Sequence, residues 1–172
     1  GHGREQIEAA FADRGITWAV QDPQLGTGHA AHCGVEAIAP RATGATDVLI
    51  VNGDLPLLRI ETLRGLLAKH RETSADATVL TCVKTDPTGY GRIFRKDDGR
   101  LWDIVEEPDA DAATKRMKEI NVGTYVFRLE AFREFYARIE PKNAQGEFYL
   151  TDVVVKTAQE GRTVASYAVP DE

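Results

Sequence analysis

The sequence predicts a single α/β domain in which helices cover a largely parallel sheet. Short aliphatic strands alternate along the chain with amphipathic helical segments, which is the pattern of that fold class. Val48–Val51 are four consecutive aliphatic residues, as expected of a strand that is covered on both faces. The 172 residues, of which 42% are hydrophobic and 28% charged, suffice for one domain with a sizeable core.

The order of the elements follows from hydrophobic periodicity and turn residues. Ile7, Ala10 and Phe11 have helical spacing, and Gly15 marks a helix end. Asp98–Gly99 is a dipeptide typical of hairpin turns. In chain order, the predicted elements are a helix at 4–14, strands at 16–20 and 45–54, a helix at 58–73, a strand at 76–85, hairpin arms at 92–96 and 100–107, a helix around 110–118, a strand at 120–128, helices at 129–139 and 150–160, and a strand at 163–169.

Composition and charge narrow the range of functions. A net charge of −6 with scattered Lys and Arg argues against a nucleic-acid surface. Runs such as Val153–Val155 are too short to cross a bilayer, and the first residues lack the apolar core of a signal peptide. Cys33 and Cys82 lack the spacing of a metal site, and we expect both to be buried in a protein of the reducing cytoplasm.

Gly26–Ala31 spells G-x-G-x-x-A, which is close to the dinucleotide-binding fingerprint. In that fingerprint the first glycine follows a strand directly, whereas here Gln21–Leu25 intervene. An NAD-binding oxidoreductase is therefore the least favoured interpretation. The stretch could instead be a helix start capped by Thr27, or a loop whose amides, such as that of Gln21, contact a base and a sugar.

Several polar residues lie at the ends of predicted strands. Asp54 follows an aliphatic strand, where it could hold Mg²⁺ or simply cap a turn. Glu106 could accept hydrogen bonds from sugar hydroxyls or be a solvated charge, and Gly91 could allow close ligand approach or form a bulge. Asn121 interrupts an apolar strand and needs partners for its amide. Without a nucleophile–base pair, this set favours binding a sugar and a nucleotide over covalent catalysis.

Six motifs occur in a characteristic order: "QDPQLGTGHA", "GDLPLL", "PTGYGRI", "IVEEPDA", "INVGTYVF" and "NAQGEFYLTD". Together they resemble the bacterial N-acetylglucosamine-1-phosphate uridyltransferase domain, the N-terminal half of the bifunctional GlmU enzymes. The resemblance implies a Rossmann-like nucleotidyltransferase sandwich with a mostly parallel mixed sheet. It also implies a reaction of UTP with N-acetylglucosamine 1-phosphate, with Mg²⁺, that gives UDP-N-acetylglucosamine and pyrophosphate for peptidoglycan synthesis.

The same resemblance implies roles for individual residues, all in binding substrate or metal and none in separate catalysis. These are uracil contacts for Gln21, Gly26 and Thr27, a Mg²⁺ ligand at Asp54, and N-acetylglucosamine contacts for Gly91, Glu106, Asn121, Tyr149 and Thr151.

The chain also departs from the family. Its first helix has no strand before it, and the family's Gly-rich loop, its Pro-Lys pair and the β-helix acetyltransferase half are not found in this sequence. A second Mg²⁺ ligand, an Asn, would fall beyond Glu172, and Glu107–Pro108 replaces a common His-Lys pair. We therefore expect residues 1–172 to be one partial nucleotidyltransferase domain, weakly active or inactive alone, from a cytoplasmic protein that is a homotrimer at full length. The alternatives are another sugar-1-phosphate nucleotidyltransferase or a non-catalytic sugar-nucleotide-binding module.

Overall fold

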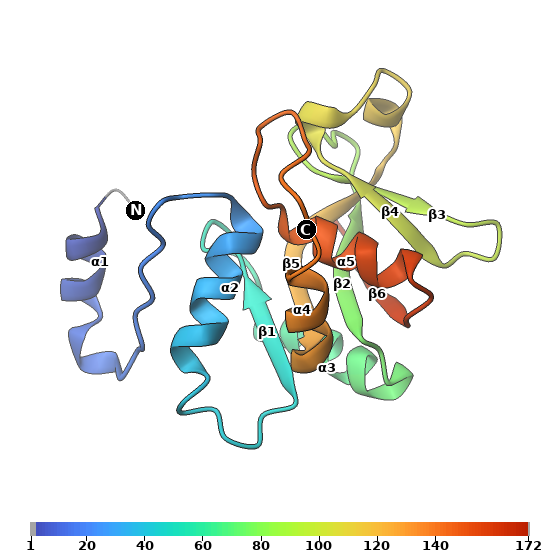
Figure 1. The fold of residues 1–172 in the computed structure, drawn as a ribbon. Coiled ribbons are helices and arrows are strands. Elements are labelled where there is room, and N and C mark those ends of the chain that lie inside the picture. Colours follow the sequence, from blue (N-terminus) through green and yellow to red (C-terminus); the bar gives the residue numbers. More distant parts are fainter. Residues whose placement is uncertain (1–2, 172) are drawn as a thin grey trace.

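The computed structural model describes residues 3–171, and it contains one six-stranded sheet with helices on both faces (Figure 1). The helices α2, α4 and α5 pack together on one face, and α3 packs on the other. The helices are α1 (Arg4–Ala10), α2 (Thr27–Ile38), α3 (Ile60–Thr73), α4 (Leu129–Tyr136) and α5 (Leu150–Gln159), with 3₁₀ turns η1 (Ala12–Arg14), η2 (Glu107–Asp109) and η3 (Thr114–Arg116). The strands are β1 (Asp47–Val51), β2 (Ala77–Val83), β3 (Arg92–Arg95), β4 (Leu101–Val105), β5 (Glu119–Arg128) and β6 (Val164–Val169).

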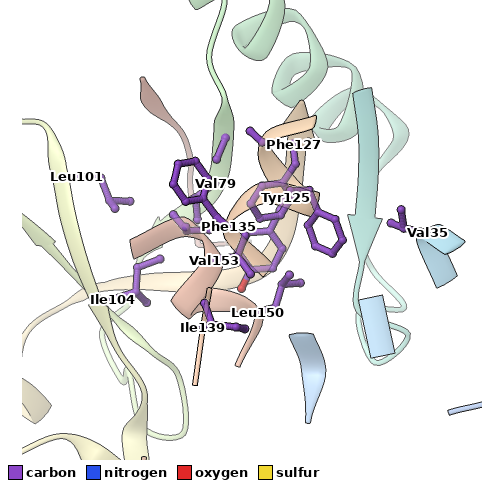
Figure 2. Close-up of a cluster of buried hydrophobic side chains, with 14 of the residues drawn as sticks. Val35, Val79, Leu101, Ile104, Tyr125, Phe127, Phe135, Ile139, Leu150 and Val153 are labelled. Carbon is purple, nitrogen blue, oxygen red and sulfur yellow. The ribbon is translucent and has the colours of Figure 1, made fainter. Parts of the chain in front are cut away.

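Each face of the sheet has its own apolar core because successive strand residues point to opposite faces. Val79 of β2 and Phe127 of β5 face α4 and α5, in the larger cluster drawn in Figure 2. Their neighbours Leu80 and Val126 face the other way and contact Leu66 of α3. All five of these side chains are fully buried.

The mixed α/β class is confirmed, but the prediction of a mostly parallel sheet is wrong. The strand order is β4-β3-β5-β2-β6, and β1 also pairs with β5. Only the β2–β6 ladder is parallel, whereas β5 runs antiparallel to β1, β2 and β3. β1, β2 and β6 do share one direction, as the helix–strand alternation predicts. The hairpin excursion through β3 and β4 returns the chain reversed, so that β5 enters the middle of the sheet in the opposite sense.

One edge of β5 changes its partner partway along the strand. β2 occupies the other edge throughout, with a register shift between Val79 and Thr81. On the changing edge, Ile120 pairs with Arg92 of β3, and Thr124–Arg128 pair with β1. Between these two ladders lies Gly123, whose φ of 85° belongs to the left-handed region that favours glycine. β1 and β3 therefore separate at this point and leave a gap in the edge.

Two predicted elements are absent from the structure. Residues 16–20 are extended but form no strand, and Ile16, Trp18 and Val20 remain exposed. A β-prone run becomes a strand only beside an edge that pairs with it, and no described edge does so here. Residues 110–118 contain only the short turn η3, because this segment offers little beyond alanine to bury. Among the residues described, no helix has the length and apolar character needed to cross a membrane.

Candidate functional site

A cleft of about 390 Å³ lies where β1 and β3 separate along β5. The loop after β1, the loop before β3, the segment after β4 and the start of α5 all contribute to its walls. Most of the predicted site residues line it, namely Thr27, Asp54, Gly91, Glu106, Asn121, Tyr149 and Thr151. Gly26 is the neighbour of Thr27, whereas Gln21 lies outside the cleft lining.

Two larger hollows are weaker candidates. One, of about 590 Å³, lies at the opposite end of β1 beside Asp47 and Arg128, away from the strand ends where α/β sheets bind ligands. Its Arg128 and Arg133 already pair with carboxylates. The other, of about 540 Å³, is formed by Gln21 and neighbouring residues against α1, which has no buried residue. Among the described residues, the first hollow has one buried polar side chain in its lining, His70, which already contacts Thr78 and Asp47, and the second hollow has none.

Glu106 is held at the floor of the cleft. Its Oε1 accepts a hydrogen bond of 2.9 Å from the Thr151 hydroxyl, while Oε2 has no hydrogen bond to the described residues. Burial raises the pKa of Glu106 above its usual value. Gly91 faces this carboxylate so closely that a Cβ there would lie 2.9 Å from Oε2. The glycine therefore packs directly against the carboxylate, and Oε2 remains able to accept a hydrogen bond.

Asn121 is 7% exposed and has its main partners within its own strand. Its Nδ2 donates to the Tyr125 hydroxyl at 2.7 Å, and its Oδ1 accepts the Gly123 N–H at 3.1 Å. Its backbone N–H donates to the Gly91 carbonyl at 2.9 Å. The side chain thus spans the bend at Gly123 and fixes the point where β1 and β3 part. The amide's remaining hydrogen and lone pairs are available to a ligand.

Asn52 is a lining residue that our sequence reasoning missed. A Cβ on Gly123 would lie 2.3 Å from Asn52 Nδ2, so this amide packs directly against the bend of β5. The signal was present in the sequence, because Asn52 is the first polar residue after the aliphatic run and precedes Asp54. Other missed lining residues are Leu55, Gly89, Tyr90, Pro108, Val122, Tyr125, Gln145, Glu147 and Leu150.

Carboxylates gather near the start of α5, because Glu106 and Glu147 line the cleft there and Asp152 lies in the first turn of α5 outside the cleft lining. Burial, followed by the charge of Glu106, raises the pKa of Asp152 to about 6. Burial also raises the pKa of Tyr149 to about 12, and its hydroxyl donates to Gln145 Oε1 at 2.6 Å. Clustered carboxylates repel phosphate and accept hydrogen bonds from neutral hydroxyls. This end of the cleft therefore favours a neutral ligand with hydroxyl donors over an anion.

The residues present fit a divalent cation held together with substrate. Asp54 is an exposed carboxylate that follows β1 and lines the cleft. No group of three His, Cys, Asp or Glu side chains within residues 3–171 could hold a metal by itself. Mg²⁺ commonly binds through one or two carboxylates with water and substrate phosphates, and Asp54 is a carboxylate that could serve in this way.

The G-x-G-x-x-A stretch packs two helix starts against each other. α2 begins at Thr27, and Gly28 N–H donates to the Phe148 carbonyl at 2.7 Å. A Cβ on Gly26 or Gly28 would lie 2.7 or 2.9 Å from that carbonyl oxygen. The prediction that Thr27 caps its own helix is wrong, because its Oγ1 instead accepts the Leu150 N–H of α5 at 3.0 Å. These glycines thus serve close chain packing, and no strand precedes them directly.

Gln21 is tied to the same loop. Its Nε2 donates to the Gly26 carbonyl at 2.9 Å and lies 3.4 Å from His29 Nδ1. Because the amide nitrogen is already engaged, the Oε1 atom is the part of Gln21 that remains to accept a hydrogen bond.

Comparisons with known proteins agree with this geometry. The nucleotidyl transferase family profile matches residues 4–172. The chain is 46% identical over 177 residues to the "Bifunctional protein GlmU" of Mycobacterium sp. (strain KMS), covering 99% of the chain and 35% of that protein. It is 45% identical over 168 residues to the protein of that name from Exiguobacterium sibiricum (98% and 36%) and 42% identical over 172 residues to that from Carboxydothermus hydrogenoformans (100% and 37%).

The chain thus spans just over a third of the length of these relatives. The family match, in contrast, extends over almost every residue of the chain. The cleft lies at the ends of strands, where α/β proteins commonly bind their ligands. On these grounds, the chain belongs to the nucleotidyl transferase family.

Proposed function

We propose that this chain forms the sugar-binding part of an enzyme that makes UDP-N-acetylglucosamine and pyrophosphate from UTP and N-acetylglucosamine 1-phosphate. The observation that carries the proposal is the cleft at the β1–β3 gap, which gathers Glu106, Asn121 and Thr151 around one space. The similarity to proteins named "Bifunctional protein GlmU" supports the same substrates.

The sugar would lie between β3 and the start of α5. The free Oε2 of Glu106 would accept from a sugar hydroxyl, and the Asn121 amide would meet a second polar group of the sugar. Gly91 would support this contact, because a side chain there would displace the Glu106 carboxylate. Tyr149 and Thr151 would complete this wall, because both line the cleft and Thr151 orients Glu106.

The uracil would lie against the loop that precedes α2. Gln21, Gly26 and Thr27 belong to this loop, and the Gln21 Oε1 atom is the acceptor that remains available there. An acceptor at this position would pair with the N3–H of uracil, a donor that cytosine lacks.

Asp54 would hold Mg²⁺ together with substrate phosphates, and the ion would neutralise the charge that develops on them. The chain itself would align the sugar phosphate for in-line attack on the α-phosphorus of UTP. No general base is required, because the attacking phosphate oxygen is already ionised at neutral pH.

The described cleft lining contains neither Lys nor Arg. Phosphoryl transfer depends on cations that stabilise the transferring group, so further positive groups must come from outside this lining. We therefore propose that residues 1–172 alone bind the sugar nucleotide but transfer poorly. We also propose a cytoplasmic protein that forms a homotrimer at full length, as the family resemblance implies.

A pyrophosphate-release assay tests the reaction. With Mg²⁺, the full-length encoded protein should release pyrophosphate from UTP and N-acetylglucosamine 1-phosphate, and an Asn121→Ala variant should have a much higher KM for the sugar phosphate. Faster turnover of glucose 1-phosphate, or of dTTP in place of UTP, would favour another sugar-1-phosphate nucleotidyltransferase. Binding of UDP-N-acetylglucosamine without any turnover would favour a non-catalytic module.

A further inference from the structure

Arg92 of β3 carries the largest of the fully buried side chains in the described structure, with 1% exposure. Its guanidinium meets three separate segments of the chain. It donates to the Tyr90 carbonyl and, at 3.3 Å, to the Lys115 carbonyl. It also lies 2.7 Å from Glu107 Oε2. One buried side chain thus joins the loop before β3, the loop before β5 and the turn η2.

Glu107 is the carboxylate within ion-pair distance of Arg92 among the described residues. A buried guanidinium needs a counter-charge, because removing one partner leaves an uncompensated charge in a poorly solvated place. Glu107 is itself only a quarter exposed, and its other oxygen lies 3.9 Å from Lys115 Nζ. The ion pair therefore fixes the position of η2 relative to β3.

The segments that this pair joins are walls of the cleft. Gly91 directly precedes Arg92, and Glu106 directly precedes Glu107. The space between Gly91 and the Glu106 carboxylate is so narrow that a single methyl group would lie 2.9 Å from Oε2. A shift of a few tenths of an ångström between β3 and η2 would therefore displace the Glu106 carboxylate from the position in which it meets a sugar hydroxyl.

The turn η2 also reaches the opposite wall. Asp109, at its end, accepts the Ala144 backbone N–H at 2.7 Å. That loop carries Gln145 and Glu147, both of which line the cleft. Glu107 does not line the cleft, but the turn that it anchors connects both of its sides.

We propose that Glu107 is a positioning residue for sugar recognition. Through Arg92, Glu107 sets the distance between Gly91 and the Glu106 carboxylate. Through η2, it holds the 143–147 loop in position against the cleft. The inference rests on the proposed function, since it specifies how the same cleft is held open for the sugar. Neither Glu107 nor Arg92 touches the ligand.

The test is a calorimetric titration of the full chain with two probes, UDP-N-acetylglucosamine and UDP. In Glu107→Ala, the dissociation constant for UDP-N-acetylglucosamine should rise about tenfold or more, whereas that for UDP should stay within about twofold. The matched control is Glu119→Ala. It removes the carboxylate that pairs with Arg95, which lies on β3 like Arg92, and the distance from Arg95 Nε to Glu119 Oε2 is 2.9 Å. Glu119 is not part of the cleft lining. This control should bind both probes like the wild type.

A double variant, Arg92→Leu with Glu107→Leu, separates positioning from folding. It leaves no unpaired buried charge, so it should melt close to the wild-type temperature even where Glu107→Ala does not fold. Its affinity for UDP-N-acetylglucosamine should nevertheless remain about tenfold reduced, because the polar link between β3 and η2 is lost. Equal weakening of both probes would show a general structural role and overturn the inference.

Wild-type affinity for UDP-N-acetylglucosamine in the double variant would also overturn it, while leaving the proposed function intact. If the wild-type chain itself failed to bind UDP-N-acetylglucosamine, the proposed function and this inference would fall together. The two failures are therefore distinguishable in one set of titrations.

Discussion

Replacing Gly91 with alanine should weaken sugar binding without weakening the fold. Gly91 does not adopt a positive φ, so alanine is compatible with its backbone. Its new methyl group, however, would lie 2.9 Å from Glu106 Oε2 and 3.2 Å from the carboxyl carbon. These distances are too short, so the Oε2 atom of Glu106 must move from the position in which it would accept a hydrogen bond from a sugar hydroxyl.

The magnitude follows from the bond that is lost. A hydrogen bond from a sugar hydroxyl to the charged Glu106 carboxylate contributes about 1.5–3 kcal/mol, and losing it corresponds to a loss of affinity of roughly ten- to a hundredfold. The fold should change by less than about 1 kcal/mol, because removing glycine also restricts the unfolded chain. Calorimetric titration with UDP-N-acetylglucosamine gives the first quantity, and urea unfolding gives the second.

Gly53→Ala is the matched control for this experiment. Gly53 lies between Asn52 and Asp54, has no positive φ, and a Cβ there would meet nothing within 4 Å. It should leave both affinity and stability near their wild-type values. The reasoning is refuted if Gly91→Ala binds UDP-N-acetylglucosamine as tightly as Gly53→Ala does.

Two further substitutions test the site from other directions. Asp152→Asn should stabilise the protein at pH 7.5: a folded-state pKa of about 6 against an ordinary 3.8 means that ionising this carboxyl costs stability above pH 6. That pKa shift equals about 3 kcal/mol, which partial solvation of the carboxyl reduces to about 1 kcal/mol. In urea unfolding, the gain in stability of Asp152→Asn should vanish by about pH 4. A variant less stable than the wild type at pH 7.5 would contradict the raised pKa of Asp152. Gly123→Ala should lower the free energy of unfolding by at least about 2 kcal/mol in the same assay. The φ of 85° at this position disfavours alanine, and the new Cβ would lie 2.3 Å from Asn52 Nδ2. Wild-type stability of this variant would show that the bend of β5 is not constrained as described.

The sequence predicts local features of this molecule well. The aliphatic run Val48–Val51 forms the last four residues of β1. As the sequence predicts, Glu106 directly follows β4 and Asn121 lies within β5. The local sequence pattern is sufficient there because the periodicity of a strand and the position of its end depend on neighbouring residues. The cleft brings Glu106 and Asn121 together, as the family resemblance implies.

Other features depend on contacts between distant segments. The antiparallel insertion of β5 is decided by which edge the hairpin returns to, and no residue within the strand signals it. An arginine is usually exposed, and nothing in the residues around Arg92 predicts its burial. The burial is explained by its contacts with Tyr90, Lys115 and Glu107, which the fold brings together. The spacing of Gly26 and Gly28 matches a phosphate-binding loop in sequence. The structure requires glycine at both positions because the Phe148 backbone packs too closely for a side chain.

The most direct test of the central claim is an NMR titration of the chain with UDP-N-acetylglucosamine in the presence of Mg²⁺. The account predicts that the amide signals of Gly91, Glu106, Asn121 and Thr151 shift together, and that Asn121→Ala weakens the binding. Absence of binding would contradict it, as would shifts confined to the hollow beside Asp47 and Arg128.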